Sequence, residues 1–233
     1  MNVMSFNPLG KFDPSAAVDA AVVAKAKAVL TSLPAVPAGL LTRLYLHWTV
    51  APFGCTFGDY NGEADFEKGI WQMIVTHDPR DNAPGLTHNP EASHTWHRNT
   101  GAVGVSIAGM NGATQHDFGP DAVTVTGLEH LCACAAAFAT AYGIDALGTV
   151  QTGTTHQGDN GPVNTAGEHT ILTHAECASI DGYLCGYTSD PDCRWDLGSL
   201  VALPSGVSLT KDMVSRCGDA LRQRVHAYKA ALT

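Results

Sequence analysis

The sequence has few charged residues and no long apolar run. Only 15% of its 233 residues are charged, and 13 Lys and Arg stand against 22 Asp and Glu, for a formal charge of −9. Because phosphate binding needs clustered basic side chains, this balance argues against a nucleic-acid partner. No segment approaches the roughly 18 to 20 uninterrupted apolar residues of a membrane span. The hydrophobic content of 45% instead predicts a compact globular chain with one sizeable core.

The N-terminus also lacks the features of a signal peptide. No cationic start precedes an apolar run, and the alanine-rich segment that follows is interrupted by Asp19, Lys25 and Lys27. We therefore expect synthesis in the cytoplasm, with the seven cysteines mostly reduced. Cys132 and Cys134, two apart on an expected helix, are predicted to be small packing residues.

Alternating strand and helix patterns predict an α/β fold with one domain, in which helices flank a central mixed sheet. Asp13 and Pro14 form a favourable helix start, and that helix is expected to end near Leu33. Strands are expected at 40–50, 70–76, 101–109 and 170–174, helices at 121–142 and about 214–232, and long loops at 78–99 and 148–167. The domain divides into an N-terminal helical segment (1–39), a core (40–205) and a C-terminal helix packed on it (206–233).

Two distant histidines stand at the ends of expected strands. His47 shares one strand face with Tyr45 and Thr49, and His174 is followed closely by Glu176. Taken alone, each histidine is better explained as a buried core residue than as a metal ligand. The stretch TSDPDCRWDLG at 188–198 offers a third ligand among Asp190, Asp192, Cys193 and Asp196. Two histidines with one carboxylate would leave zinc an open fourth position, as in catalytic zinc sites.

Five motifs in order carry a family resemblance: LHWT, IWQMIV, SHTWHRNTGAVGVSIAGM, ILTHAE and RWDLGSL. From about Leu44 to Leu200 the chain resembles the zinc-dependent N-acetylmuramoyl-L-alanine amidases of the phage-lysozyme and peptidoglycan-recognition-protein superfamily, above all the phage-type members. The resemblance implies a zinc amidase core at 40–205 that cleaves the bond between N-acetylmuramic acid and L-alanine in peptidoglycan. It also implies a single-domain, monomeric lysin, made in a host cytoplasm and released to act on the cell wall.

The resemblance also implies a set of metal ligands. In the family, the histidines of the HWT and THAE motifs bind zinc, which corresponds to His47 and His174. The third ligand follows a basic catalytic residue by two positions, and Asp196 stands in this relation to Arg194. Asp190 is the main rival, because it fits the Asp-Pro pattern of some relatives.

The rival ligands lack the preceding basic residue. Asp190 has none two positions before it, and Cys193 would need one at position 191, where Pro191 stands. Asp196 is therefore the predicted ligand, with Asp190 second, and with Cys193 and Asp192 as the remaining alternatives.

The resemblance does not assign a general base to this chain. Arg194 is expected to stabilise the oxyanion, but an arginine cannot donate a proton as a lysine does. Relatives carry a Tyr where this chain has Trp71, or a Glu where it has Ser106. Glu176 is a possible base, and its alternative role is to cap a helix or support a ligand.

Substrate contacts are expected from Trp71 and from the long loop. His94 stands where relatives place a residue beside the substrate groove, the alternative being a solvated loop histidine. Asn99 and Thr100 belong to the N-T-G turn, where turn formation alone would also explain them. A peptidoglycan-binding module of the same fold that has lost turnover remains the alternative function.

Overall fold

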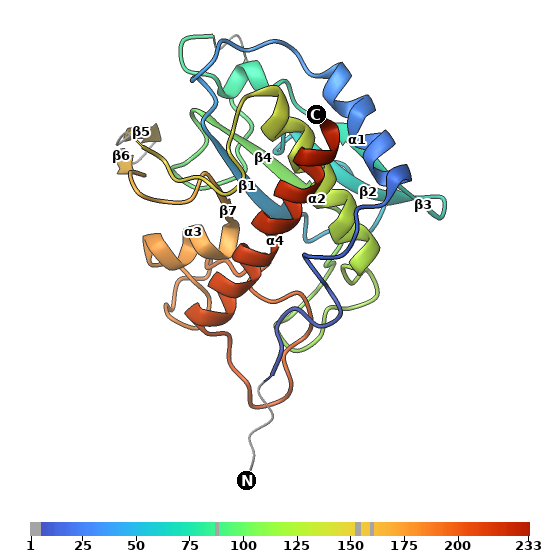
Figure 1. Ribbon diagram of the computed structural model, residues 1–233. Coiled ribbons are helices and arrows are strands. Elements are labelled where there is room, and N and C mark those ends of the chain that lie inside the picture. The colour runs from blue at the N-terminus through green and yellow to red at the C-terminus, as the bar shows by residue number, and fades with distance from the viewer. Residues whose placement is uncertain (1–5, 87–88, 152–154, 159–160) are drawn as a thin grey trace.

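A five-stranded sheet lies at the centre of the computed structural model, which describes residues 6–86, 89–151, 155–158 and 161–233 (Figure 1). The strand order is β3-β2-β4-β1-β7. The strands are β1 (Arg43–Trp48), β2 (Gly62–Glu67), β3 (Ile70–Val75), β4 (Ala102–Ile107) and β7 (Ile171–Thr173). Only β2 and β3 pair antiparallel within it, so the sheet is mixed and the predicted α/β single domain is confirmed.

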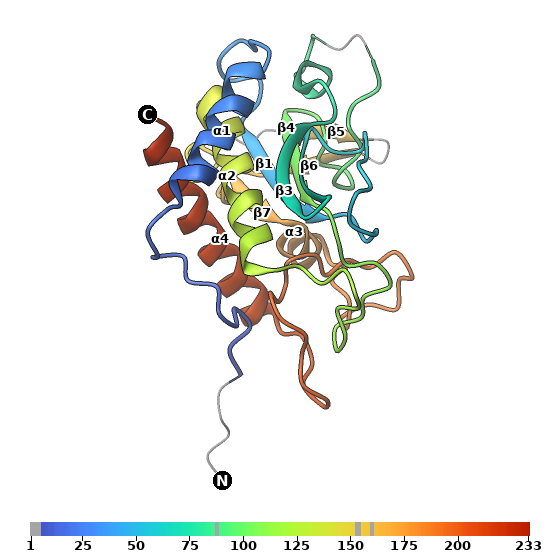
Figure 2. The same ribbon diagram turned by 90° about the vertical axis from the view of Figure 1, so that its right-hand side faces the viewer.

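Helices α1 (Ala20–Ser32), α2 (Val125–Ala141) and α4 (Lys211–Leu232) cover one face of this sheet, and mainly loops cover the other (Figure 2). The described residues also form α3 (His174–Asp181) and a short 3-10 helix η1 at Pro79–Asn82. α2 is nearly all buried because it packs against the sheet and between α1 and α4. None of the helices in the described part of the chain has the length and apolar character needed to cross a bilayer.

The two central strands are buried on both faces. Leu44, Leu46 and Trp48 of β1 join the core beneath the helices, whereas Tyr45 and His47 point to the opposite face, as the alternation predicts. Fully buried strands are typical of a sheet covered on both sides, so the loop face is also closed around β1 and β4.

The first helix begins later than predicted. Its N-cap is Asp19, whose side chain accepts the backbone N–H of Ala21 at 2.7 Å. Asp13 instead accepts the N–H and hydroxyl of Ser15, at 2.9 and 2.7 Å, in a local turn. Asp side chains that bond the backbone two residues ahead favour turns as well as helix caps, which explains the error. The helix ends before Leu33, as expected.

Several elements, among them β2 and α3, were not predicted from the sequence. β2 is rich in acids but pairs with both β3 and β4, and it turns into β3 through Lys68 and Gly69, which both have positive φ. α3 begins at His174, where Thr173 and Glu176 form a reciprocal capping box. The long loop predicted at 148–167 contains an antiparallel pair of short strands, β5 (Thr155–Gly158) and β6 (Gly161–Asn164). Residues 152–154 and 159–160 of this loop lie outside the described residues, as does His88 of the loop at 78–99.

Candidate metal centre

Three predicted ligands from distant parts of the chain meet in one buried group. Nδ1 of His47 lies 3.1 Å from Nδ1 of His174, which lies 3.3 Å from Oδ2 of Asp196. The third side of the triangle, from His47 Nδ1 to Asp196 Oδ2, measures 3.9 Å. Within the described residues this is the group of His, Cys, Asp and Glu side chains that could hold a metal ion.

The triangle has the dimensions of a zinc site. Zinc binds histidine nitrogen and carboxylate oxygen at roughly 2.0 to 2.2 Å in a tetrahedron, whose ligand atoms are then roughly 3.3 to 3.6 Å apart. The observed edges of 3.1, 3.3 and 3.9 Å bracket this spacing. Two imidazole nitrogens and a carboxylate oxygen converging on one point are also a donor set that suits Zn²⁺. The residues present therefore fit a metal with one open coordination position.

His47 is held by the sheet and by a neighbouring hydroxyl. It is fully buried, and burial is the main cause that holds its pKa well below the usual value, with further lowering by His174 and His94. A neutral imidazole is the form that binds a metal. Its second nitrogen, Nε2, lies 3.1 Å from Oγ1 of Thr95, so Thr95 fixes the ring with Nδ1 toward the other ligands.

His174 and Asp196 belong to one local unit. His174 is the first residue of α3, and the N–H of the next residue, Ala175, donates to the backbone carbonyl of Asp196 at 3.1 Å. Beside Asp196, Trp195 packs edge-on against Trp48, with ring centroids 4.6 Å apart. Backbone pairing thus places two ligands side by side before any metal binds.

The loop before β4 supports the site through buried polar contacts. Arg98 is fully buried and pairs with Glu168 at 2.6 Å and with Asp181 at 2.7 Å. Asn99 accepts the N–H of Thr95 through its side chain at 2.8 Å. These contacts hold Thr95 beside His47, so Asn99 acts on the site at least partly by positioning its neighbour.

A cavity of about 1230 Å³ opens over this group. Its wall includes His174 and Asp196 together with four other expected site residues: His94, Asn99, Thr100 and Arg194. His94 is buried rather than a solvated loop residue, and its ring lies over Gly104, where a Cβ would meet it at 2.4 Å. The absence of a side chain at Gly104 of β4 therefore makes room for the ring of His94.

Arg194 lies in the cavity wall beside the ligands. Its Nη1 donates to the carbonyl oxygens of Asp192 and Cys193, and its charge contributes to the lowered pKa of His47. Its backbone is paired with the segment after α3, through Tyr183 and Cys185, at 3.1 Å in both bonds. A cationic side chain thus lies in the same cavity wall as His174 and Asp196.

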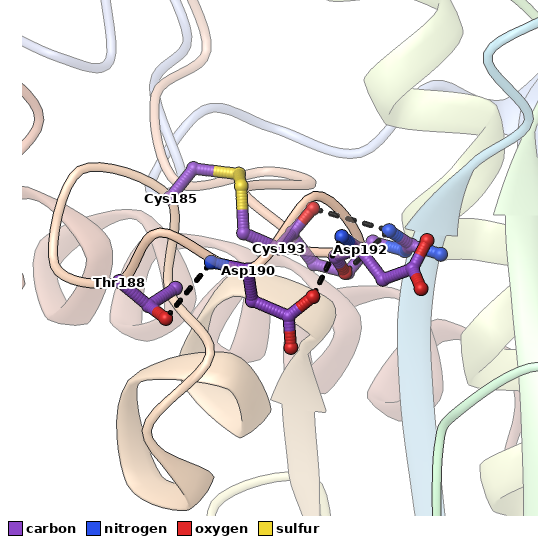
Figure 3. Close-up of a disulfide and its surroundings, with 6 residues drawn as sticks. Cys185, Thr188, Asp190, Asp192 and Cys193 are labelled. Atoms are coloured by element: carbon purple, nitrogen blue, oxygen red, sulfur yellow. Dashed lines mark hydrogen bonds between the residues drawn. A yellow bond between two sulfur atoms is a disulfide. The ribbon is translucent and has the colours of Figure 1, made fainter.

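The other acids of the 188–198 stretch do not join the ligand group. Asp190 and Asp192 are exposed, and the side chain of Asp190 accepts the N–H of Asp192 at 2.9 Å (Figure 3). Cys193 forms a disulfide with Cys185, so it provides no thiolate for a metal. This disulfide is the exception to the expectation of mostly reduced cysteines, because the other five cysteines are free. Cys132 and Cys134 are free and buried, as predicted.

Two predicted site residues lie away from the cavity. Trp71 packs on the helix-covered face of the sheet, where its ring fills the space beside Gly127 of α2. Glu176 is buried against Arg222 of α4, with two bonds of 2.9 Å, and it accepts the N–H of Thr173. The capping alternative therefore describes Glu176, and neither residue borders the cavity beside the metal group.

Several cavity residues were not predicted, and Tyr60 is the one that lies beside a metal ligand. Tyr60 lies two residues before the start of β2, lines the cavity and places its ring centroid 5.2 Å from that of His47. Burial, and then the charge of Asp196, raise the pKa of Tyr60 above its usual value, so its hydroxyl keeps its proton. Because β2 was not predicted, nothing in the sequence indicated that Tyr60, which lies in the loop before it, would reach the site.

Fold and site together define a single α/β domain with a buried group of two histidines and one carboxylate that opens on a cavity. No protein-family description, curated protein or solved structure matches the chain.

Proposed function

We propose that the protein is a zinc-dependent N-acetylmuramoyl-L-alanine amidase that hydrolyses the bond between N-acetylmuramic acid and L-alanine of peptidoglycan. The observation that carries this proposal is the His47, His174 and Asp196 triangle, open to a cavity with Arg194 in its wall. The order of family motifs along the chain supplies the substrate class.

Zinc bound to these three side chains would polarise the amide carbonyl and make a water molecule acidic enough to attack it. Arg194 would stabilise the negative charge that develops on the carbonyl oxygen, and it stays charged at any working pH. Thr95 would keep His47 in the tautomer that presents Nδ1.

The cavity offers contacts that suit a glycopeptide. Trp96 lies in its wall with 56% of its surface exposed, and Tyr183 packs edge-on against it at 5.6 Å. An exposed indole presents a flat apolar face to a sugar ring, while His94, Asn99 and Thr100 offer polar groups deeper in the wall.

Two residues support the alternative function, a peptidoglycan-binding module without hydrolase activity. Ser106 stands where some relatives carry a glutamate, and Trp71 faces away from the cavity. A protein that binds zinc and peptidoglycan without releasing amine would be such a module.

The test is the release of new amino termini from purified cell-wall peptidoglycan, measured together with zinc content. We expect one zinc per chain, amine release that stops on treatment with a chelator, and recovery when zinc is restored. Glycan strands of unchanged length would show that the amide is cleaved rather than the sugar backbone. Bound zinc without amine release would contradict the hydrolase proposal.

A further inference from the structure

Glu63 lies on β2 and points to the same face of the sheet as His47. The strand register pairs Glu63 with Ser106, and Ser106 with His47, so the three residues form one row across β2, β4 and β1. Since neighbouring strands are roughly 4.8 Å apart, two strand spacings separate Glu63 from His47. Only the small side chain of Ser106 stands between them in the row.

The carboxylate of Glu63 is buried without a cationic partner. It is 0% exposed, and its Oε2 accepts the N–H of Phe57 and the hydroxyl of Ser106, each at 3.3 Å. Its Oε1 has no hydrogen-bond partner among the described residues. Glu176 is also buried, but Arg222 binds both of its oxygens. Because an incompletely paired buried carboxylate is costly, a purely structural role does not account for Glu63.

The surroundings of Glu63 set its protonation near neutrality. Burial raises its pKa to about 7; the Phe57 hydrogen bond opposes this shift, and the charge of Asp65 adds to it. The other titratable groups near it are Tyr60, from the preceding loop, and Cys134 of α2. No lysine or arginine pairs with Glu63 in the part of the chain that the structure describes.

Tyr60 is the cavity residue that precedes Glu63 by three positions in the chain. It lines the cavity beside His47, and the charges of Asp196, Asp59 and Glu63 all act on its phenol. Its hydroxyl makes one long bond, 3.4 Å to the carbonyl oxygen of Trp48. A phenol held so weakly is free to turn its proton toward a stronger acceptor.

We propose, resting on the hydrolase activity proposed above, that Glu63 is the proton acceptor of the reaction and is reached through the Tyr60 hydroxyl. As the attacking water bonds to the amide carbon, one of its O–H bonds breaks and that proton passes to the Tyr60 oxygen. The Tyr60 proton moves at the same time to Glu63. When the C–N bond breaks, the reverse transfer delivers a proton to the departing nitrogen, a step that Arg194 cannot perform.

The test compares Glu63→Gln and Tyr60→Phe with wild type and with Glu67→Gln. Glu67 lies at the exposed end of the same strand, so its change is the matched control. In both Glu63→Gln and Tyr60→Phe we expect one zinc per chain and a fall in amine release from peptidoglycan of about 100-fold or more. Wild-type activity should rise with pH through neutrality, and this rise should vanish in Glu63→Gln.

A second readout does not depend on activity. In zinc-free protein with ¹³C-labelled glutamate carboxyls, one resonance should titrate near neutral pH in wild type, Tyr60→Phe and Glu67→Gln, and be missing in Glu63→Gln. The role of Glu63 is overturned if Glu63→Gln keeps the wild-type rate and pH profile, or if no carboxyl titrates near neutrality. Either result would leave the proposed amidase activity unaffected. If zinc-loaded wild type releases no amine, both proposals fail together.

Discussion

The hydroxyl oxygen of Thr95 lies 3.1 Å from Nε2 of His47, on the side of the ring opposite the metal group. The same oxygen lies 2.9 Å from Nδ1 of His94. With Nδ1 of His47 directed to a metal, its Nε2–H donates to Thr95, and Thr95 in turn donates to His94. One hydroxyl therefore sets the proton positions of two imidazoles.

We predict that Thr95→Val weakens zinc binding by about 10- to 100-fold, because His47 loses the acceptor that orients its ring. Thr95→Ser keeps the hydroxyl and should bind as wild type does. Competition with a chromophoric chelator measures both affinities. Equal affinity in Thr95→Val and wild type would show that the sheet alone orients His47.

Asp196→Ala should lose both zinc and activity, whereas Asp190→Ala should keep both. Asp196 is buried 3.3 Å from His174, while Asp190 is exposed and bonded to the backbone of Asp192. Measuring the zinc content of both variants after dialysis decides which aspartate is the ligand. The zinc content of His47→Ala serves as the reference for a protein that has lost one ligand. The reverse outcome would move the third ligand to Asp190.

The disulfide predicts a selective loss of activity on reduction. Cys193 precedes Arg194, and the bond ties it to Cys185, whose N–H donates to the Arg194 carbonyl. Cys193→Ser should lower stability by about 2 to 3 kcal/mol, the loop-closure contribution for so short a loop. It should also reduce the rate several-fold yet leave zinc bound, because Asp196 keeps its own backbone bond to Ala175.

Urea unfolding, zinc content and amine release measure these three effects. Cys55→Ser is the control, since Cys55 is a free, half-buried cysteine. Wild type treated with a reductant should behave as Cys193→Ser does. Loss of zinc in Cys193→Ser would mean that the disulfide positions Asp196 as well as Arg194.

Glu176→Gln separates a structural role from a catalytic one. Removing the charge leaves Arg222 buried with only Asp219 as an ionic partner, so we predict a destabilisation of about 3 kcal/mol or more. Folded protein should retain zinc and most of its activity per molecule. A Glu176→Gln variant that is as stable as wild type but inactive would show that Glu176 has a catalytic role.

The raised pKa of Glu63 predicts how stability depends on pH. The folded protein holds this proton up to about pH 7, whereas the unfolded chain releases it near the ordinary value of 4.5. Folding therefore binds a proton between these pH values, so the carboxyl reduces stability increasingly as pH rises through that window. Relative to Glu63→Gln, wild type should lose up to about 3 kcal/mol across it, measured by urea unfolding at several pH values.

Most core elements could be predicted because their signals are local, whereas the ligands were predicted from the order of the family motifs. His47 stands on an alternating apolar strand, and the basic residue two positions before Asp196 singled it out among four candidates. The α2 and α4 patterns likewise repeat at helical spacing. The strands and helices thus required only neighbouring residues, whereas the choice of ligands also required the family resemblance.

What could not be predicted depends on contacts between distant segments. β2 carries Glu63 and Asp65, whose burial is possible only because β3, β4 and a preceding loop surround them. Glu176 is drawn away from the cavity by Arg222, 46 residues further along the chain. The N-cap at Asp19 rather than Asp13 reflects a competition between two equally suitable aspartates.

A metal ion bound to this group would also stabilise the folded chain. His47 and His174 are 127 residues apart in sequence, and Asp196 follows on the same local unit as His174. An ion bound to all three would cross-link the middle of the sheet to the segment after β7 and close a very long loop in the unfolded chain. Zinc would then raise the melting temperature in proportion to the logarithm of its concentration.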